Sequence, residues 1–317
     1  ASLAAILDAC LIGTTPMGPV RFLSALIGAG PAGDQIVIWE IRMPRAIAAF
    51  IVGGALGLCG AALQGLLRNP LAEPALLGVS SGAALAAILV LYYGAAVSGY
   101  LLPALAIMGA LLAVGSVWLL AGQGASATRL VLAGVAINAF LSALMALALN
   151  YAPSMFAMQE IDFWLLGSLA NRGWDQVLLA LPFVVLGAVF LFLSRNYLRA
   201  LSLGEASAAS LGFAGRRYPL LVLFGIAFAV GASVAVAGTI GFIGLVVPHL
   251  MRPLVGQDPG RLLWASALAG ALLLLLADVL VLNTVGTQEL RIGAVTAFIG
   301  APFFFWLIVR SRLGVTL

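Results

Sequence analysis

The sequence predicts an all-α, polytopic membrane protein with about ten transmembrane helices per subunit. Of its 317 residues, 63% are hydrophobic and 8% are charged, whereas a soluble domain has roughly 45–50% and about 25%. The mean hydropathy is +1.17, and apolar runs recur along the whole chain. The lipid bilayer is therefore the natural solvent for most of the side chains.

The apolar runs divide one transmembrane domain, residues 1–317, into predicted spans when about 20 residues are allowed per crossing. The first run is short and looks truncated, and the abundant glycine predicts close helix approach as well as local breaks. The spans are expected at 1–14, 43–66, 76–94, 100–121, 128–150, 176–194, 218–238, 240–255, 262–282 and 293–310.

All 15 basic residues are arginines, so the chain lacks the lysine with which a P-loop holds nucleotide phosphates. The arginines are spread between apolar segments, which indicates a topology signal and not a nucleic-acid site. The positive-inside rule places the richer set of loops, and both termini, in the cytoplasm. The richer set holds Arg68, Arg129, Arg195, Arg199, Arg216, Arg217, Arg252, Arg261, Arg310 and Arg312, and the other holds Arg21, Arg42, Arg45, Arg172 and Arg291.

The longest predicted cytoplasmic link runs from Arg195 to Arg217. Breaks at Gly204, Gly212 and Gly215 predict two short helices joined by turns, at about 196–215. A soluble partner could grip such a firm, Arg-flanked element. A capped connector without a partner is an equally open interpretation.

The segment 66–85 contains Pro70 and Pro74, which prevent a continuous helix. Irregular backbone near membrane depth is tolerated only where protein or a water-filled cavity covers it, which favours a gate or pathway lining. An ordinary cytoplasmic turn would also explain Pro70, Asn69 and Glu73.

Arg42 and Arg45 lie at the predicted outer start of the second span, where Pro44 suits a first helical turn. Two cations there oppose the macrodipole, which suggests docking of an acidic protein or contact with lipid phosphate.

The outer segment 151–175 resembles an interfacial helix. Its aromatic residues fit ordinary anchoring or the mouth of a pathway. They are Phe156, Phe163, Trp164 and Trp174, with Met155 and Met158, around Glu160, Asp162 and Asp175.

Four further residues have specific expectations. Asp278 lies inside an apolar span, so it is either a functional acid or a partner in a helix–helix hydrogen bond. His249 has too few ligand neighbours for a metal site, and we expect a structural or interfacial role. Cys10 and Cys59 are expected to pack in apolar helices without a disulfide.

Several stretches together resemble the permease family of bacterial ATP-driven type II importers for iron chelates, haem and cobalamin. The resemblance covers almost the entire chain, and the order and spacing of the stretches make it specific. They are IRMPRAIAAFIVGGALGLCGAALQGLLRNPLAEPALLGVSSGAAL at 41–85, LVLAGVAIN at 130–138, FWLLGSL at 163–169, LSLGEASAASLGF at 201–213, GTIGFIGLVVPHLMR at 238–252 and ELRIGAVTAFIGAPFFFWL at 289–307.

The resemblance implies a homodimer in the bacterial inner membrane, two cytoplasmic ATPase subunits that carry ATP and Mg, and a periplasmic substrate-binding protein. It places a cytoplasmic gate at Asn69 and Leu71 and binding-protein contacts at Arg42 and Arg45. Leu282 stands where the cobalamin permease has a third docking arginine, and Arg291 could substitute. The implied ATPase coupling segment, Leu201 to Leu211, includes Leu203, Gly204, Glu205, Ala206 and Ser207.

The predicted function is therefore import of an iron chelate, either a ferric siderophore or haem, by alternating access, with cobalamin as the alternative. No cofactor is expected on this chain. An enzyme is not expected, because no nucleophile-and-base arrangement is evident. A secondary transporter would require Asp278 and an ion gradient.

Overall fold

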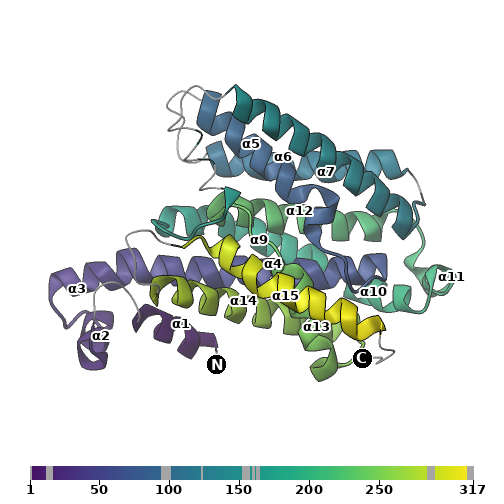
Figure 1. The fold of residues 1–317 in the computed structure, drawn as a ribbon. Coiled ribbons are helices and arrows are strands. Elements are labelled where there is room, and N and C mark those ends of the chain that lie inside the picture. The colour runs from purple at the N-terminus through teal and green to yellow at the C-terminus, as the bar shows by residue number, and fades with distance from the viewer. Residues whose placement is uncertain are drawn as a thin grey trace.

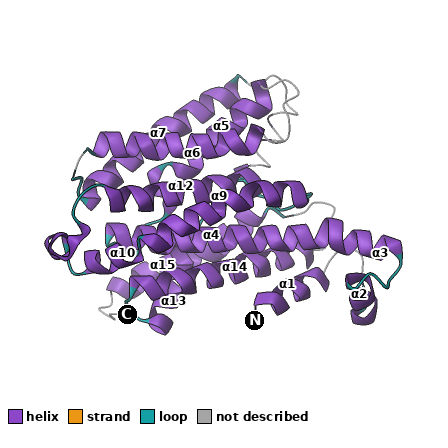
Figure 2. Cartoon of the chain, turned by 180° about the vertical axis from the view of Figure 1, so that it is seen from behind, coloured by secondary structure: helices purple, strands orange, loops and turns teal. Residues whose placement is uncertain are grey.

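The computed structural model describes residues 2–11, 17–93, 101–122, 124–151, 158, 161, 165–283 and 290–312. Within these ranges the chain is helical and has no strand. Figures 1 and 2 show the helices packed as a bundle, with short helices at its two ends. The predicted all-α membrane architecture is confirmed.

Ten helices correspond to the predicted spans, with boundaries within about three residues for most of them. Six are long and apolar enough to cross a bilayer, and three of the others are shorter apolar helices. The ten are α1 (Ser2–Leu11), α4 (Met43–Leu67), α5 (Val79–Tyr93), α6 (Leu101–Ala121), α7 (Ala127–Asn150), α9 (Trp174–Leu193), α12 (Arg217–Ala237), α13 (Ile243–Val255), α14 (Pro259–Asn283) and α15 (Ile292–Arg312).

The helices α4 and α12 form the centre of the bundle. Of the most apolar window of each, 78% is buried, against 17% for α7. In Figure 1, α5, α6 and α7 form one outer layer, and α14 lies on the opposite side of α4. Both central helices are apolar on every side, as expected of helices enclosed by other helices.

Glycines allow the backbones of α4 and α14 to touch. A Cβ atom on Gly53 would lie 2.3 Å from the carbonyl oxygen of Gly270, and one on Gly57 would lie 2.1 Å from that of Ser266. No larger residue fits at either position without separating the helices. The same kind of contact joins α5 to α6 at Gly82. The predicted close approach of helices is thus confirmed.

The second span does not begin at residue 43, as the sequence suggested. Instead, α3 (Ala32–Ile36) and the π-helical η1 (Val37–Arg42) lead into α4 without a break, which makes a helix of 36 residues. Pro44 lacks the N–H needed for an α-helical bond, and the preceding turn is wider, with the N–H of Met43 donating to the carbonyl of Ile38. The expectation of two arginines at a helix N-terminus was therefore wrong.

The helix α2 (Pro19–Leu26) was not predicted, because its eight residues are too few for a span. Phe22 and Ala25 are buried, whereas Val20 and Leu23 are exposed. An ion pair between Arg21 and Asp34 joins α2 to α3. These two helices lie at the far end of the bundle, which is the end away from α10 and α11 in Figure 1.

Candidate functional site

A short helical element protrudes from one end of the bundle, which we name the coupling end (Figure 2). The coupling element comprises α10 (Arg195–Ser202), α11 (Glu205–Ala208) and the π-helical η3 (Ala209–Phe213). Helix α15 ends at the same side of the molecule (Figure 1). Gly204, Gly212 and Gly215, the three predicted breaks, have φ values of 107°, 87° and 98°. These left-handed conformations favour glycine and form the turns of the element.

The predicted coupling residues lie on the surface of this element. Leu203, Glu205 and Ala206 are exposed, and Gly204 and Ser207 are half-buried. Leu203 is 69% exposed, and it lies outside the apolar spans.

The base of the coupling element is held by aromatic packing. The rings of Tyr197 and Tyr218 stack at a centroid distance of 5.4 Å, and Phe213 meets Tyr218 edge-on at 5.0 Å. Leu198 and Leu201 of α10 are buried. Burial, followed by the nearby Glu205 charge, raises the pKa of Tyr197. This packing fixes α10 and the end of η3 against the start of α12.

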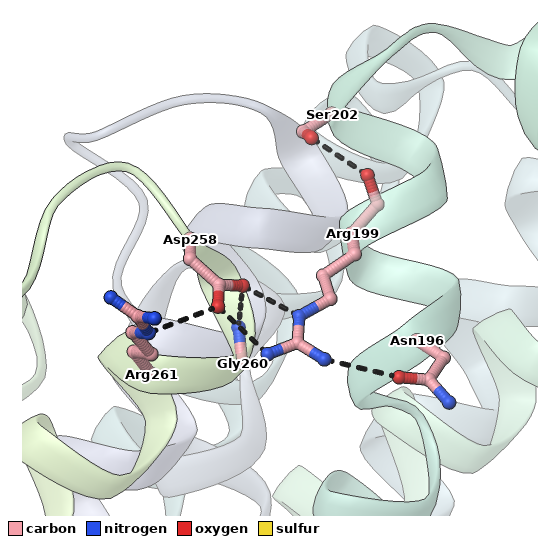
Figure 3. A network of polar contacts seen from close by, with 6 residues as sticks. All are labelled: Asn196, Arg199, Ser202, Asp258, Gly260 and Arg261. Atoms are coloured by element: carbon pink, nitrogen blue, oxygen red, sulfur yellow. Dashed lines mark hydrogen bonds and ion pairs between the residues drawn. The ribbon is translucent and has the colours of Figure 1, made fainter.

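Two ion pairs connect the coupling element to other helices. Arg199 of α10 donates from Nε and Nη2 to the two carboxylate oxygens of Asp258, at 2.6 and 2.7 Å (Figure 3). The hydrogen bonds from Arg199 hold the pKa of Asp258 below its usual value. Arg68 Nη2 donates to Glu205 Oε1 at 2.7 Å. The coupling element therefore contacts both the C-terminus of α4 and the turn before α14.

The loop after α4 carries the predicted gate residues. Arg68, at φ 49°, ends α4, and Asn69 Oδ1 accepts a hydrogen bond from the N–H of Leu71 at 2.9 Å. Asn69 and Leu71 are both exposed. Because Arg68 binds Glu205, the structure places the residue before the predicted gate residue Asn69 in contact with a predicted coupling residue.

Glu73 ties the other end of this loop to α13. Its Oε1 accepts a hydrogen bond from the N–H of Phe242 at 2.6 Å, at the start of that helix. Burial raises the pKa of Glu73, and the hydrogen bond opposes the rise. The sequence showed a lone acid between two prolines but gave no indication of this partner.

At the far side of α4, Arg42 and Arg45 make contacts within the chain. Arg42 is 8% exposed and donates from Nη1 to the carbonyl of Cys10 at 2.9 Å. Arg45 forms a bidentate pair with Asp278 of α14, with N···O distances of 2.9 to 3.1 Å. Of the two interpretations of Asp278, the structure supports the helix–helix partner. Arg291 directly precedes α15 and is half-buried.

The remaining candidates have modest structural roles. The ring of His249 meets Phe303 edge-on at 5.6 Å. Cys10 and Cys59 are buried free thiols. Among the described residues, no three His, Cys, Asp or Glu side chains gather as a metal site.

In the outer aromatic segment, Trp174 donates from Nε1 to the carbonyl of Trp39 at 2.7 Å. Six other residues of that segment lie outside the described residues, namely Met155, Phe156, Glu160, Asp162, Phe163 and Trp164.

A bundle of apolar helices with a protruding helical element and an adjoining irregular loop is consistent with a transport permease. The sequence matches the FecCD transport family over residues 1–310. The chain therefore belongs to the FecCD family of ABC importer permeases.

Similar proteins agree with this membership. The chain is 40% identical to YvrB of Bacillus subtilis, an uncharacterized ABC transporter permease, over 88% of this chain and 80% of YvrB. It is 42% identical to the vitamin B12 import permease BtuC of Klebsiella pneumoniae, over 89% and 85% of the two chains. The BtuC of Citrobacter koseri is 40% identical over the same shares.

Solved structures show the same fold. The chain is similar, with a TM-score of 0.84 and 32% identity, to an ABC transporter of the metal-chelate type in an inward-facing conformation. The match covers 98% of this chain and 96% of that one. PsaBC from Streptococcus pneumoniae is a more distant fold relative, with a TM-score of 0.55 and 17% identity over 86% and 92% of the two chains.

Proposed function

We propose that this chain is the permease subunit through which an ATP-driven importer moves an iron chelate from the periplasm to the cytoplasm by alternating access. The observation that carries the proposal is the Arg68–Glu205 pair, which joins the exposed coupling element to the loop of Asn69 and Leu71. Movement of the coupling element would thereby reach the proposed gate directly.

The proposed assembly has two copies of this chain, two ATPase subunits and one periplasmic binding protein in the inner membrane. ATP and Mg are bound by the ATPases, in keeping with the absence of lysine from this chain. Leu203, Glu205 and Ala206 present the surface that the ATPase would contact. The chain's own task is to form the pathway and its gates.

Cobalamin is the second candidate substrate. The relatives named as vitamin B12 permeases are 40–42% identical to this chain, which favours it. Leu282, at the position where the resemblance implies a docking arginine, favours an iron chelate instead. Both substrates are large metal chelates, so the same architecture suits either.

Docking of the binding protein at Arg42 and Arg45 is a separate part of the proposal. Because both guanidinium groups already bind groups of this chain, reversing their charge would also disturb the fold. Asp278→Asn is therefore the matched control, since it disturbs the Arg45 pair without changing the basic residues. Weaker docking in Arg45→Gln than in Asp278→Asn, with the loss greatest at low salt, would support the docking role.

The test of function is reconstitution in liposomes with the candidate ATPase and binding protein. Uptake of radiolabelled ferric siderophore, haem and cobalamin is measured side by side. We expect uptake of a ferric siderophore or haem that requires ATP and all three components. Uptake of cobalamin alone would reassign the substrate, and transport by the lone chain without ATP would contradict the importer assignment.

A further inference from the structure

Helix α14 has an aspartate near each end, and each binds an arginine of another element. Asp258 immediately precedes α14 and binds Arg199 of the coupling element. Asp278 lies 20 residues further on and binds Arg45 of α4. At about 1.5 Å per residue, the two aspartates are roughly 30 Å apart along the helix axis. The helix thus connects the coupling end with the opposite half of α4.

The ion pair between Arg199 and Asp258 is partly exposed, but several further contacts fix its geometry. The same carboxylate accepts a hydrogen bond from the N–H of Gly260 at 2.9 Å, so it caps the first turn of α14 while it holds Arg199. A Cβ atom on Gly260 would lie 2.6 Å from Nη2 of Arg199. The guanidinium therefore rests on the backbone of α14 itself (Figure 3).

The side chain of Arg199 is also fixed from its own helix. Its Nη1 donates to Asn196 Oδ1 at 3.3 Å. Arg261 approaches Asp258 only at 3.8 Å and its side chain is 75% exposed. Arg199, with both of its bonds to the carboxylate below 3 Å, is thus the residue that connects α10 to α14.

The body of α14 packs closely against α4. Its most extensive contact is with α4, where Gly53 and Gly57 meet Gly270 and Ser266 at backbone distance. No flexible side chain separates the two helices at these points. A displacement at Asp258 would therefore pass along α14 and into α4, since no side chain is available at these contacts to absorb it.

We propose that Arg199 is a positioning residue that transmits movement of the coupling element to α14, and through α14 to the Arg45–Asp278 end of the bundle. The proposal rests on the proposed function, because it assumes that an ATPase moves the coupling element. It adds a second route to the one through Arg68 and Glu205. The route through Arg68 and Glu205 ends at the loop of Asn69, whereas the route through Arg199 follows helix α14.

The test compares Arg199→Gln and Gly260→Ala with Arg261→Gln in the reconstituted importer. Gly260→Ala keeps both charges and removes only the space for the guanidinium, so it isolates geometry from charge. The measured quantity is substrate taken up per ATP hydrolysed. We expect both Arg199→Gln and Gly260→Ala to lower it by about fivefold, within the usual range of coupling between sites, and Arg261→Gln to leave it unchanged.

A second measurement guards against simple misfolding. Spin labels on α10 and on the outer half of α14 report whether their separation changes when ATP binds. In the wild type, we expect the separation of the labels to stay constant. In Gly260→Ala, we expect the distribution of separations to become broader. An unchanged transport ratio in both variants, or an equal loss in Arg261→Gln, would refute the proposal. Uptake by the wild type that needs no ATPase would instead refute the proposed function.

Discussion

Arg45 and Asp278 form an ion pair in the interior of the bundle, where their side chains are 13% and 4% exposed. An isolated charge at such a site is costly, and a bidentate partner offsets much of that cost. Arg42 satisfies its charge differently, through the carbonyls of Cys10 and Leu11 at the end of α1. Each arginine thereby fastens the continuous helix from Ala32 to Leu67 to a different neighbour.

Removing one member of the Arg45–Asp278 pair should destabilise the protein more than removing both. Arg45→Met alone or Asp278→Leu alone should each lower the free energy of unfolding by roughly 3 kcal/mol, because each leaves a buried charge without its partner. The double variant should recover most of this loss. Thermal unfolding in detergent measures all three, and additive losses would contradict the prediction.

Glu73 should make stability depend on pH in the opposite sense to a salt-bridged acid. Burial raises its pKa in the folded state, so the folded protein binds a proton more tightly, and stability falls as pH rises above the ordinary carboxyl pKa. Glu73→Gln keeps an acceptor for the N–H of Phe242 and should remove this pH dependence. Glu73→Ala loses the acceptor and should cost about 1–3 kcal/mol. Melting temperatures from pH 4 upward test both variants.

At the scale of elements, the contact between α4 and α14 depends on the absence of side chains. Gly57 of α4 faces the backbone of Ser266, whereas Gly65, two turns later, faces only the side chain of Leu198, with the nearest atom 3.5 Å from a Cβ. Gly57 is therefore needed for the close contact between α4 and α14, whereas the position of Gly65 has room for a methyl group.

Gly57→Ala should destabilise the protein by about 1–3 kcal/mol, because the added methyl group must push the helices apart. Gly65→Ala is the matched control and should be neutral or slightly stabilising, since alanine is the better helix former. Detergent-solubilised variants compared by thermal unfolding give the answer. Equal behaviour of the two variants would show that α4 and α14 are less tightly packed than described.

The sequence predicted most elements but few of their partners. Apolar runs identify spans because the bilayer sets their length, and Gly204, Gly212 and Gly215 mark turns because their φ values exclude most other residues. Local pattern could not reveal that Asp278 meets Arg45 or that Glu73 reaches Phe242, since these pairs are more than 160 residues apart. The continuation of α4 past Pro44 was missed because a π-helical turn leaves no simple sequence signal.

At the scale of the whole molecule, the distribution of arginines and the family membership favour one orientation, with the coupling element in the cytoplasm. Cysteine labelling would test it. Leu203→Cys should react with a membrane-impermeant maleimide only in inside-out vesicles, and Val20→Cys only in right-side-out vesicles. The two natural cysteines are buried, so the unmodified protein should give a low background. Reversed labelling would contradict the predicted topology.

The continuous helix from Ala32 to Leu67 also determines how far the protein reaches. Its 36 residues extend about 54 Å at 1.5 Å per residue, whereas a bilayer with its headgroups is roughly 40–45 Å thick. A tilt of about 20° shortens the reach by only a few ångströms. The helix is therefore longer than the bilayer is thick, so part of it would lie outside the lipid. In the predicted orientation, the α3 end of this helix would face the periplasm, where soluble proteins could reach it.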